Sequence, residues 1–375
     1  MTFLKISTAV LLSCYALSIS AKEEPQSWVD TFLEELGSSE DIDVSQGVDW
    51  AVLPGPFANP EQGFGLGIAA VGLYSPLEDK DSAPLSTVSI TGYGSSSGSY
   101  GIGVNNRTYF ENDEIRLLVQ AKASHTPEYY WGIGKEQAEN EGNKTLVEAE
   151  IFGFTPKIAY QFYPNTYLLA GFDLESHRKQ TSDSLLLNSK DLENTLLTAA
   201  TISLEYDSRD FELNAHKGML LSINWNEYSK SLGSDYEFNK ATFNYRQYYK
   251  VTGDTVLAWE AYSETVQGGD VPWFALSSLG SDKRMRGYYN GQYRDNTQAS
   301  AQIEVRHQFN QRHGMVAWAG GGNVADSYQG LFDSKWLPTY GVGYRFAFKP
   351  RVNVRLDYGI GKDSQAVYFQ INEAF

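Results

Sequence analysis

Residues 365–375 read QAVYFQINEAF, and the chain ends on the aromatic Phe375. Phe369, Ile371 and Phe375 share one parity, which is the period of a β-strand with one apolar face. A strand of this kind at the end of a chain is typical of a transmembrane β-barrel, because the last strand must pair with the first and show apolar side chains to lipid. Glu373 interrupts the apolar parity, and we expect it to lie near the level of the lipid headgroups.

The composition combines a polar average with many aromatic residues. Mean hydropathy is −0.39 and charged residues make up 20%, values that a soluble protein could also have. Aromatic residues reach 14% of the chain, and there are 34 glycines. A membrane barrel explains both features, since polar residues facing its lumen cancel the apolar residues facing lipid, and aromatic girdles mark the two interfaces.

The N-terminal part of the chain is predicted to lie outside the barrel. Residues 1–21 combine Lys5, an apolar run and small residues, which is the pattern of a secretory signal peptide. Residues 22–47 form an acidic leader that we expect in the periplasm, and residues 48–375 would form the barrel. The single cysteine, Cys14, falls within the signal, so we expect no thiol in the mature chain. Its context also leaves open a lipoprotein signal.

The formal net charge of −16 argues against nucleic acid as a partner, because phosphate recognition needs a basic surface. After the signal no apolar stretch reaches the ~20 residues that a spanning helix requires. If the protein lies in a membrane, it must therefore cross it with strands.

From residue 48 onward the hydrophobic pattern has a period of two. One parity is apolar and the other carries the charges, which indicates a polar lumen and an apolar outer wall. We predict an all-β fold, a transmembrane antiparallel barrel of about 16 strands, an even number as such barrels require. The predicted strands are 145–163, 166–178, 194–206, 217–229, 235–250, 254–266, 297–309, 313–323, 338–348, 351–361 and 365–375, with four more between 64 and 124 and one near 48–53.

The connections between these strands alternate between short and long. Short periplasmic turns and long outer loops are typical of outer-membrane barrels, so we expect the protein in the outer membrane of a Gram-negative bacterium. The longest connection contains SDKRMRGYYNGQYRDN (281–296). Its residues Arg286, Gly287 and Tyr288 resemble the tip of the sixth loop of the BamA/TamA superfamily, also called bacterial surface antigen domains. The resemblance implies that this long loop folds into the lumen.

The resemblance also implies partners for the loop arginine. In that family the arginine is held by acids on the two strands that follow the loop, and Glu304 matches the first of them. Gly320 stands where the second acid is expected, so one partner is missing. A guanidinium inside a narrow lumen needs a carboxylate to replace its hydration, which supports a pairing of Arg286 with Glu304 on physical grounds. The alternative is an exposed loop in which Arg286 and Gly287 are incidental.

A second stretch, YDSRDFELNAHKG (206–218), resembles a periplasmic turn motif of the same family. Ala215 stands where the family commonly has proline. An ordinary polar turn is the alternative, since aspartate favours turns by itself. The matching residues are Asp207, Arg209, Asp210 and Gly218.

Too few residues precede the predicted barrel to form a POTRA domain, so the chain resembles a barrel-only subgroup of the superfamily. This resemblance implies a role in protein or lipid insertion or translocation at the outer membrane, with membrane lipid, a protein client or a second copy of the chain as partners. The alternative is a passive pore or small-solute channel, in which charged lumen residues set ion preference. The candidate lumen charges are Lys240, Arg246, Glu260, Glu304, Arg306, Arg345, Arg355 and Asp357.

An outer-membrane hydrolase is a third alternative. No histidine lies in a recognisable nucleophile motif or at the ligand spacing of a metal site, and no glycine-rich loop precedes a phosphate-binding helix. We therefore expect no enzymatic activity, no metal and no cofactor. The histidines are His125, His177, His216, His307 and His313.

Overall fold

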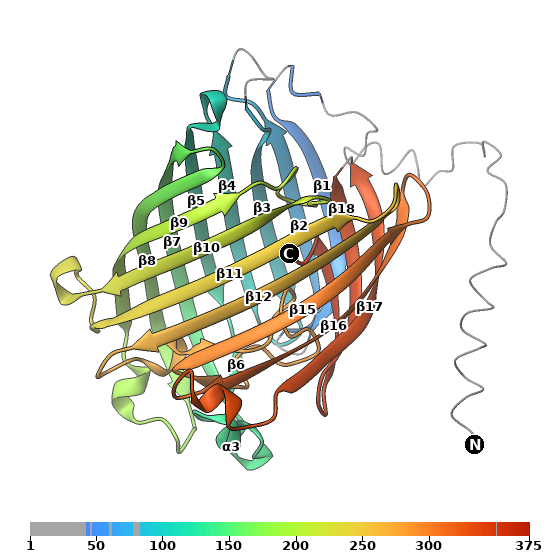
Figure 1. The fold of residues 1–375 in the computed structure, drawn as a ribbon. Helices are drawn as coiled ribbons and strands as arrows, with labels where there is room; N and C mark the ends of the chain where they lie inside the picture. Colours follow the sequence, from blue (N-terminus) through green and yellow to red (C-terminus); the bar gives the residue numbers. More distant parts are fainter. Residues whose placement is uncertain (1–42, 46, 60–61, 78–82, 350) are drawn as a thin grey trace, which may run out of the picture. The chain divides into compact units, whose positions relative to one another are not determined.

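The described part of the chain is an antiparallel β-barrel (Figure 1). The computed structural model describes residues 43–45, 47–59, 62–77, 83–349 and 351–375. The predicted signal peptide and almost all of the predicted leader lie outside the described residues. Within the described residues, no helix is long and apolar enough to cross a membrane.

Sixteen strands form the wall, and each neighbours the next along the chain. The wall strands are β1 (Asp49–Asn59), β2 (Gly63–Tyr74), β3 (Ser86–Ser95), β4 (Tyr100–Tyr109), β5 (Ile115–His125), β7 (Thr145–Tyr163), β8 (Thr166–Ser182), β9 (Thr195–Asp207), β10 (Gly218–Tyr228), β11 (Phe238–Lys250), β12 (Thr255–Gln267), β15 (Thr297–Gln308), β16 (His313–Ala325), β17 (Leu337–Lys349), β18 (Val352–Ile360) and β19 (Gln365–Ile371). The predicted fold class and strand number are confirmed.

The remaining elements are short and lie in the connections. They are β6 (Glu128–Tyr130), β13 (Ser277–Ser278), β14 (Arg294–Asp295), the helix α3 (Lys135–Ala138) and the 3-10 turns η1 (Glu111–Asp113), η2 (Glu141–Asn143), η3 (Ser189–Leu192), η4 (Lys230–Leu232), η5 (Trp273–Ala275) and η6 (Gly330–Phe332). The strand β6 pairs with β7 beyond the end of β5, and β13 pairs with β14 within the longest loop.

Long and short connections lie at opposite ends of the barrel. The end that carries α3, here called the long-loop end, holds the connections between β5 and β7, β8 and β9, β12 and β15, and β16 and β17 (Figure 1). The other end, here called the short-turn end, holds tight turns such as Pro164–Asn165 between β7 and β8. This alternation is the one that the sequence predicted.

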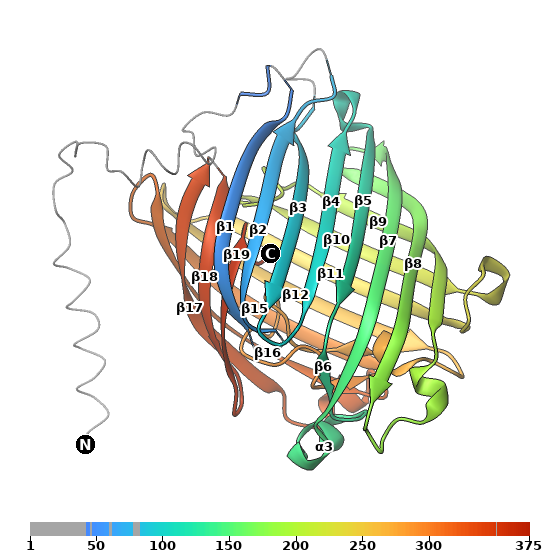
Figure 2. The same cartoon turned by 180° about the vertical axis from the view of Figure 1, so that it is seen from behind.

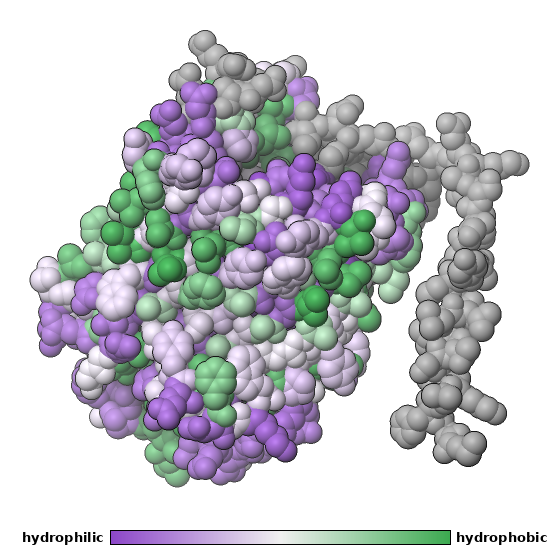
Figure 3. Space-filling model, in the orientation of Figure 1, coloured by the Kyte–Doolittle hydropathy of each residue, from purple (hydrophilic) through white to green (hydrophobic). Residues whose placement is uncertain are grey.

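Side chains alternate between the two faces of the wall. On β7, Phe152, Phe154 and Ile158 are exposed on the outside, whereas on β15 Glu304 and Arg306 are buried inside. Figure 3 shows hydrophobic residues spread over the wall and hydrophilic residues gathered toward both of its ends. This distribution is the one expected of a barrel that meets lipid around its middle.

The first and last strands meet at a seam without a shared ladder among the described residues. β1 pairs in register with β2, and β19 pairs with β18, while β1 and β19 lie side by side. Phe369 lies on the parity of β19 that faces outward, yet a Cβ placed on Gly55 would fall into the Phe369 ring from the inner face of β1. β19 therefore lies partly behind β1, as Figure 2 shows, and the barrel closes by overlap.

The last four residues depart from the predicted strand. β19 ends at Ile371, Asn372 takes a left-handed φ of 68°, and the chain turns into the lumen. Glu373 and Phe375 are buried there, and Glu373 lies 2.7 Å from the guanidinium of Arg345. The expectation that Phe375 faces lipid and Glu373 lies at the headgroup level is wrong. The arginines inside the barrel attract the carboxylate, and the tail follows it inward.

Candidate functional site

The loop between β12 and β15 enters the lumen from the long-loop end. The short β13–β14 hairpin forms its base, and residues 279–293 form its tip. At the tip, Met285 has a positive φ of 51°, and Arg286 has no solvent exposure at all. The loop that the sequence predicted to fold inward is therefore docked inside the barrel.

Arg286 is held by two carboxylates and one aromatic ring. Its Nη2 lies 2.6 Å from Glu304 Oε2 on β15, and its Nη1 lies 2.7 Å from Asp357 Oδ2 on β18. The guanidinium also lies 3.6 Å from the ring centroid of Trp318 on β16, which adds a cation–π contact. Both carboxylates are fully buried, so each ion pair is shielded from water.

Asp357 supplies the acid that the sequence did not show at position 320. A Cβ on Gly320 would lie 2.9 Å from the Cα of Gln302, so the wall itself leaves no room for a side chain there. Asp357 instead reaches the loop arginine from β18. It lies across from Gly343, whose missing side chain leaves the carboxylate its space. The arginine thus has two acidic partners, one of them from a different strand than the resemblance implied.

Asp357 also binds two further arginines. Arg345 Nη1 lies 2.5 Å from Asp357 Oδ1, and Arg355 Nη1 lies 2.9 Å from Asp357 Oδ2. Arg355 also pairs with Asp282 of the loop at 2.5 Å. One carboxylate therefore joins the loop tip to β17 and β18, and the loop is held from two positions along its length.

The backbone of the loop tip is held as firmly as its side chain. The Arg286 carbonyl accepts a hydrogen bond from Thr339 Oγ1 at 2.6 Å, and the Gly287 amide donates to the Tyr368 hydroxyl at 3.0 Å. The Tyr288 hydroxyl donates to the carbonyl of Pro338 at 2.6 Å. Tyr368 belongs to β19, so the loop also contacts the last strand at the seam.

Gly359 of β18 packs closely against the backbone of the loop tip, so a substitution there tests whether the loop is docked. A Cβ at Gly359 would lie 2.7 Å from the carbonyl carbon of Arg286 and 2.8 Å from the amide nitrogen of Gly287. We expect Gly359→Val to displace the loop and to destabilise the barrel by about 1–3 kcal/mol, as overpacking does. The measurement is the temperature at which the folded band on a gel converts to the unfolded mobility.

Gly94→Val is the matched control for this variant. A Cβ at Gly94 meets no atom within 4 Å, so the same substitution should leave the transition temperature of the barrel almost unchanged. An equal shift in the two variants would show that valine in a strand, and not contact with the loop, causes the effect.

The second sequence motif forms a compact turn at the short-turn end. Arg209 makes a two-pronged contact with Asp207, at 2.8 and 3.0 Å, and Arg116 of β5 binds the same carboxylate at 3.1 Å. Gly218 has a φ of 93°, and a Cβ there would lie 2.9 Å from the Cα of Arg209. Such a φ favours glycine, which explains why the turn ends on this residue.

Asp210 closes the other half of the turn. Its carboxylate accepts the backbone amide of His216 at 2.9 Å and pairs with Arg351 at 2.8 Å, which lowers the pKa of Asp210. Burial and the neighbouring Arg351 lower the pKa of His216 to about 4. The imidazole is therefore neutral near pH 7, and its Nδ1 can accept a hydrogen bond from Arg351, 3.1 Å away.

The chain's C-terminal tail connects the two motifs. Arg306 of β15 pairs with Glu304 at 2.7 Å and donates to the backbone oxygen of Phe375 at 2.8 Å. Phe375 in turn packs with Ala215 of the turn, at the position where the related family commonly has proline. A line of contacts thus runs from the docked loop through Arg306 and the tail to the short-turn end, and sequence reasoning missed this line.

The charges predicted to line the lumen point inward and pair with one another. Burying opposite charges as pairs removes most of their field, so they leave little free charge to select ions. Besides the pairs already described, Arg246 pairs with Glu260 at 2.8 Å, Arg284 with Glu260 at 2.8 Å and Lys240 with Glu264 at 3.8 Å.

The long loops also cover the long-loop end of the lumen. Ala138 of α3 packs with Leu279, Met285 and Tyr288 of the docked loop and with Leu337 of β17 in one apolar cluster. A bond from the Gln292 amide to the Ala138 carbonyl, 3.1 Å long, ties α3 to the loop. The loops therefore form a packed cap over the tip.

The histidines contact neighbours that do not form a nucleophile site. Among the described residues, no group of three His, Cys, Asp or Glu side chains is placed to hold a metal ion. The observed ring contacts are His125 with Tyr100, His177 with Phe274, His307 with Phe309, and His313 with Tyr344.

Comparison with known proteins places these features in a family. Residues 86–375 match the Omp85 superfamily domain. No curated protein matches the chain in sequence.

Solved structures share the fold at low sequence identity. BamA of Haemophilus ducreyi, in a crystal structure lacking POTRA domains 1–3, matches with a TM-score of 0.51 and 12% identity over 91% of this chain and 76% of that one. CdiB of Escherichia coli matches with a TM-score of 0.57 and 13% identity over 97% and 73%. CdiB of Acinetobacter baumannii matches with a TM-score of 0.53 and 11% identity over 86% and 59%.

Proposed function

The chain belongs to the Omp85 superfamily and forms an outer-membrane barrel of a Gram-negative bacterium, and we propose that it assists the insertion or translocation of polypeptide or lipid at that membrane. The observation that carries this proposal is the seam. β1 pairs on one side with β2 and β19 pairs on one side with β18, while the two strands overlap without a shared ladder among the described residues.

An unpaired strand edge can template another strand. Its backbone N–H and C=O groups have no ladder partner, and an added strand would satisfy them by β-augmentation. In a bilayer the free energy gained by adding a strand is large, because each unsatisfied backbone group in hydrocarbon costs several kcal/mol. The overlap of Phe369 with Gly55 keeps the edges covered in the resting barrel, and separation of the two strands would expose them to a client.

A lock across the seam tests the proposal. We expect the double variant Gly55→Cys and Phe369→Cys, joined by a short bifunctional maleimide, to lose the ability to speed folding of a reporter barrel. The reporter is an unfolded eight-stranded outer-membrane protein added to liposomes that contain the full chain, and its heat-resistant gel band measures folding. The unlocked double variant should retain the acceleration.

A matched lock within the wall controls for cross-linking itself. Phe172 and Ala200 face each other in register on the outer face of β8 and β9, which are already paired, so Phe172→Cys with Ala200→Cys should not affect the activity when cross-linked. If the cross-linked seam variant speeds reporter folding as much as the unlocked variant does, the seam is not where the reporter is inserted. If unmodified chain gives no acceleration over empty liposomes, insertion of this client is not its function.

A passive pore is the alternative function, and the arrangement of the lumen argues against it. The tip of the docked loop lies in the lumen, and the cap around Ala138 and Tyr288 covers the long-loop end. The lumen charges pair with each other instead of forming an open ring. We therefore expect a small conductance for the intact barrel, and a large steady conductance would favour the pore. No enzymatic step forms part of the proposal.

A further inference from the structure

The hairpin β1–β2 is apolar on both faces, unlike the strands around the rest of the barrel. Ala51 and Leu53 of β1 and Val71 and Leu73 of β2 share the inner face and are buried. Residues on the outer face are apolar too, and Leu66 there is 65% exposed. A wall that separates lipid from a polar lumen needs only one apolar face. The inner apolar face therefore requires an apolar neighbour inside the barrel.

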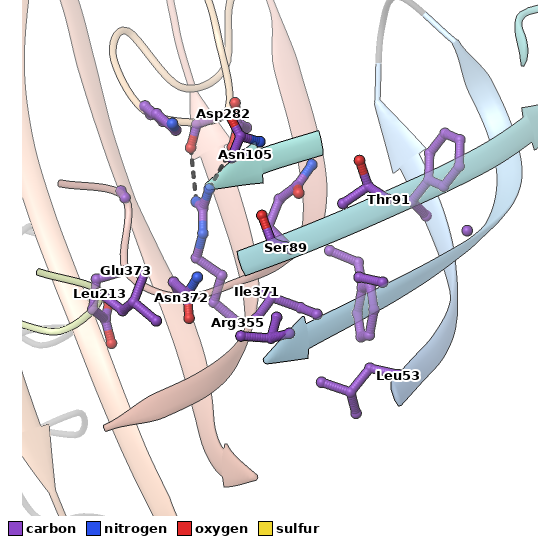
Figure 4. Close-up of a pocket in the computed structure, with 18 of the residues that line it drawn as sticks. Leu53, Ser89, Thr91, Asn105, Leu213, Asp282, Arg355, Ile371, Asn372 and Glu373 are labelled. Carbon is purple, nitrogen blue, oxygen red and sulfur yellow. Dashed lines mark hydrogen bonds and ion pairs between the residues drawn. The ribbon is translucent and has the colours of Figure 1, made fainter. Parts of the chain in front are cut away.

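β19 covers only part of this inner face. Phe369 packs over Gly55, but next to it a cavity of about 520 Å³ extends into the lumen. Leu53, Phe57 and Ile371 line its apolar side, and Figure 4 shows Leu53 and Ile371 at this side of the cavity. The volume lies within the range of small-molecule sites, which is roughly 300–1,000 Å³.

The other side of the cavity is polar and carries one uncompensated positive charge. Most charged residues there have an opposite partner, as Figure 4 shows for Arg355 and Asp282. Lys283, at the tip of the docked loop, is exposed toward the cavity and makes no ion pair within the part of the chain that the structure describes. The paired charges are Arg209 with Asp207, Arg246 with Glu260, Arg355 with Asp282, Glu373 with Arg345 and Glu212 with Arg107.

We propose that this cavity binds an anionic membrane phospholipid, with an acyl chain along Leu53, Phe57 and Ile371 and the phosphate at Lys283. An amphiphile matches both halves of the cavity, since each buried CH₂ contributes about 0.8 kcal/mol and the ammonium attracts a phosphate. The seam offers the path, because strands that overlap without a ladder can separate toward the bilayer. Lipid binding at this cavity depends on the geometry of the seam and the charge of Lys283, and it requires no insertion activity.

Lipid binding to the purified full chain tests the site. The protein is held in an uncharged maltoside detergent, and dioleoyl phosphatidylglycerol or dioleoyl phosphatidylcholine is added as the probe. Native mass spectrometry then counts retained lipids. We expect wild type to retain one phosphatidylglycerol at about tenfold lower lipid concentration than phosphatidylcholine, because the choline cation of phosphatidylcholine already neutralises its phosphate. A tenfold ratio corresponds to roughly 1.4 kcal/mol.

Two variants separate the halves of the site, and each has a matched control. Lys283→Gln should remove the preference for phosphatidylglycerol, whereas Lys230→Gln, on an exposed loop, should keep it. Leu53→Asn should weaken both lipids, whereas Leu66→Asn, on the outer face of the same hairpin, should not. The Lys283 ammonium makes no ion pair with the described residues, so its variant is expected to fold, which the gel mobility of the heated and unheated barrel checks.

Three results would overturn the proposal. The first is equal retention of the two lipids by wild type, and the second is an unchanged preference in Lys283→Gln. The third is displacement of the lipid by inorganic phosphate at equal concentration, because this would mean that the site takes a phosphate group without a chain. If the lipid is retained as expected but the chain does not speed reporter folding, the cavity is still a lipid site and only the insertion role is rejected.

Discussion

Arg286→Ala should lower the stability of the barrel by about 3 kcal/mol, near the low end of what breaking a buried ion pair costs. The low end applies because Glu304 keeps Arg306 and Asp357 keeps Arg345 as partners. Loss of the anchor should also free the loop tip and open the lumen. The measurements are the transition temperature of the barrel on a gel, the single-channel conductance and the entry of large antibiotics into cells.

Two further variants set the scale for this effect. Glu304→Gln keeps a neutral acceptor for the guanidinium, so it should cause the same changes more weakly. Arg178→Ala removes an arginine from an exposed position on β8 and should change stability by no more than about 0.5 kcal/mol. An Arg286→Ala barrel that matches wild type in stability, conductance and antibiotic entry would show that the loop is not docked.

Asp357→Asn is expected to be at least as damaging, at about 3–5 kcal/mol, because it removes the carboxylate that three arginines share. Arg286, Arg345 and Arg355 all lie within 3 Å of it. Without its negative charge the three guanidinium groups repel one another inside the lumen. The transition temperature measures the loss, and Asp270→Asn, at a solvent-exposed ion pair, serves as the control.

The same variant tests which position can hold the second acid. Adding Gly320→Asp to Asp357→Asn restores the net charge and places the acid where related barrels are expected to have it. We expect no recovery, since a side chain at 320 would press against the backbone of Gln302. Recovery of the transition temperature would instead show that the wall can accommodate an acid there.

Most of the wall was predictable because its physical cause is local. The alternation of apolar and charged residues identified each strand from 145 onward to within a few residues, and β7 matches its predicted bounds. Turn residues and loop lengths then predicted which connections lie together at each end of the barrel. The largest error in a strand bound concerned β1, which was predicted near 48–53 but extends to Asn59. A strand that is apolar on both faces shows no alternation that would mark its length.

The site was only partly predictable because its contacts are distant in sequence. A resemblance pointed to Arg286 and Glu304, and the structure places them 2.6 Å apart. No local pattern could select Asp357 from the other inward charges, since its role depends on the space beside Gly343 on the neighbouring strand. The inward tail was missed for a similar reason: parity describes a strand, but Asn372 ends the strand and only the buried arginines explain the new direction.

The overlap of β1 and β19 has a mechanical consequence. In a cylinder sealed by hydrogen bonds all the way round, strand number and stagger together set the diameter. Here β1 and β19 can slide over each other without breaking a hydrogen bond of a shared ladder. The circumference of the lumen is therefore adjustable. The chain end, anchored at Arg306 and Arg345, would act as the stop that limits how far the cylinder can widen.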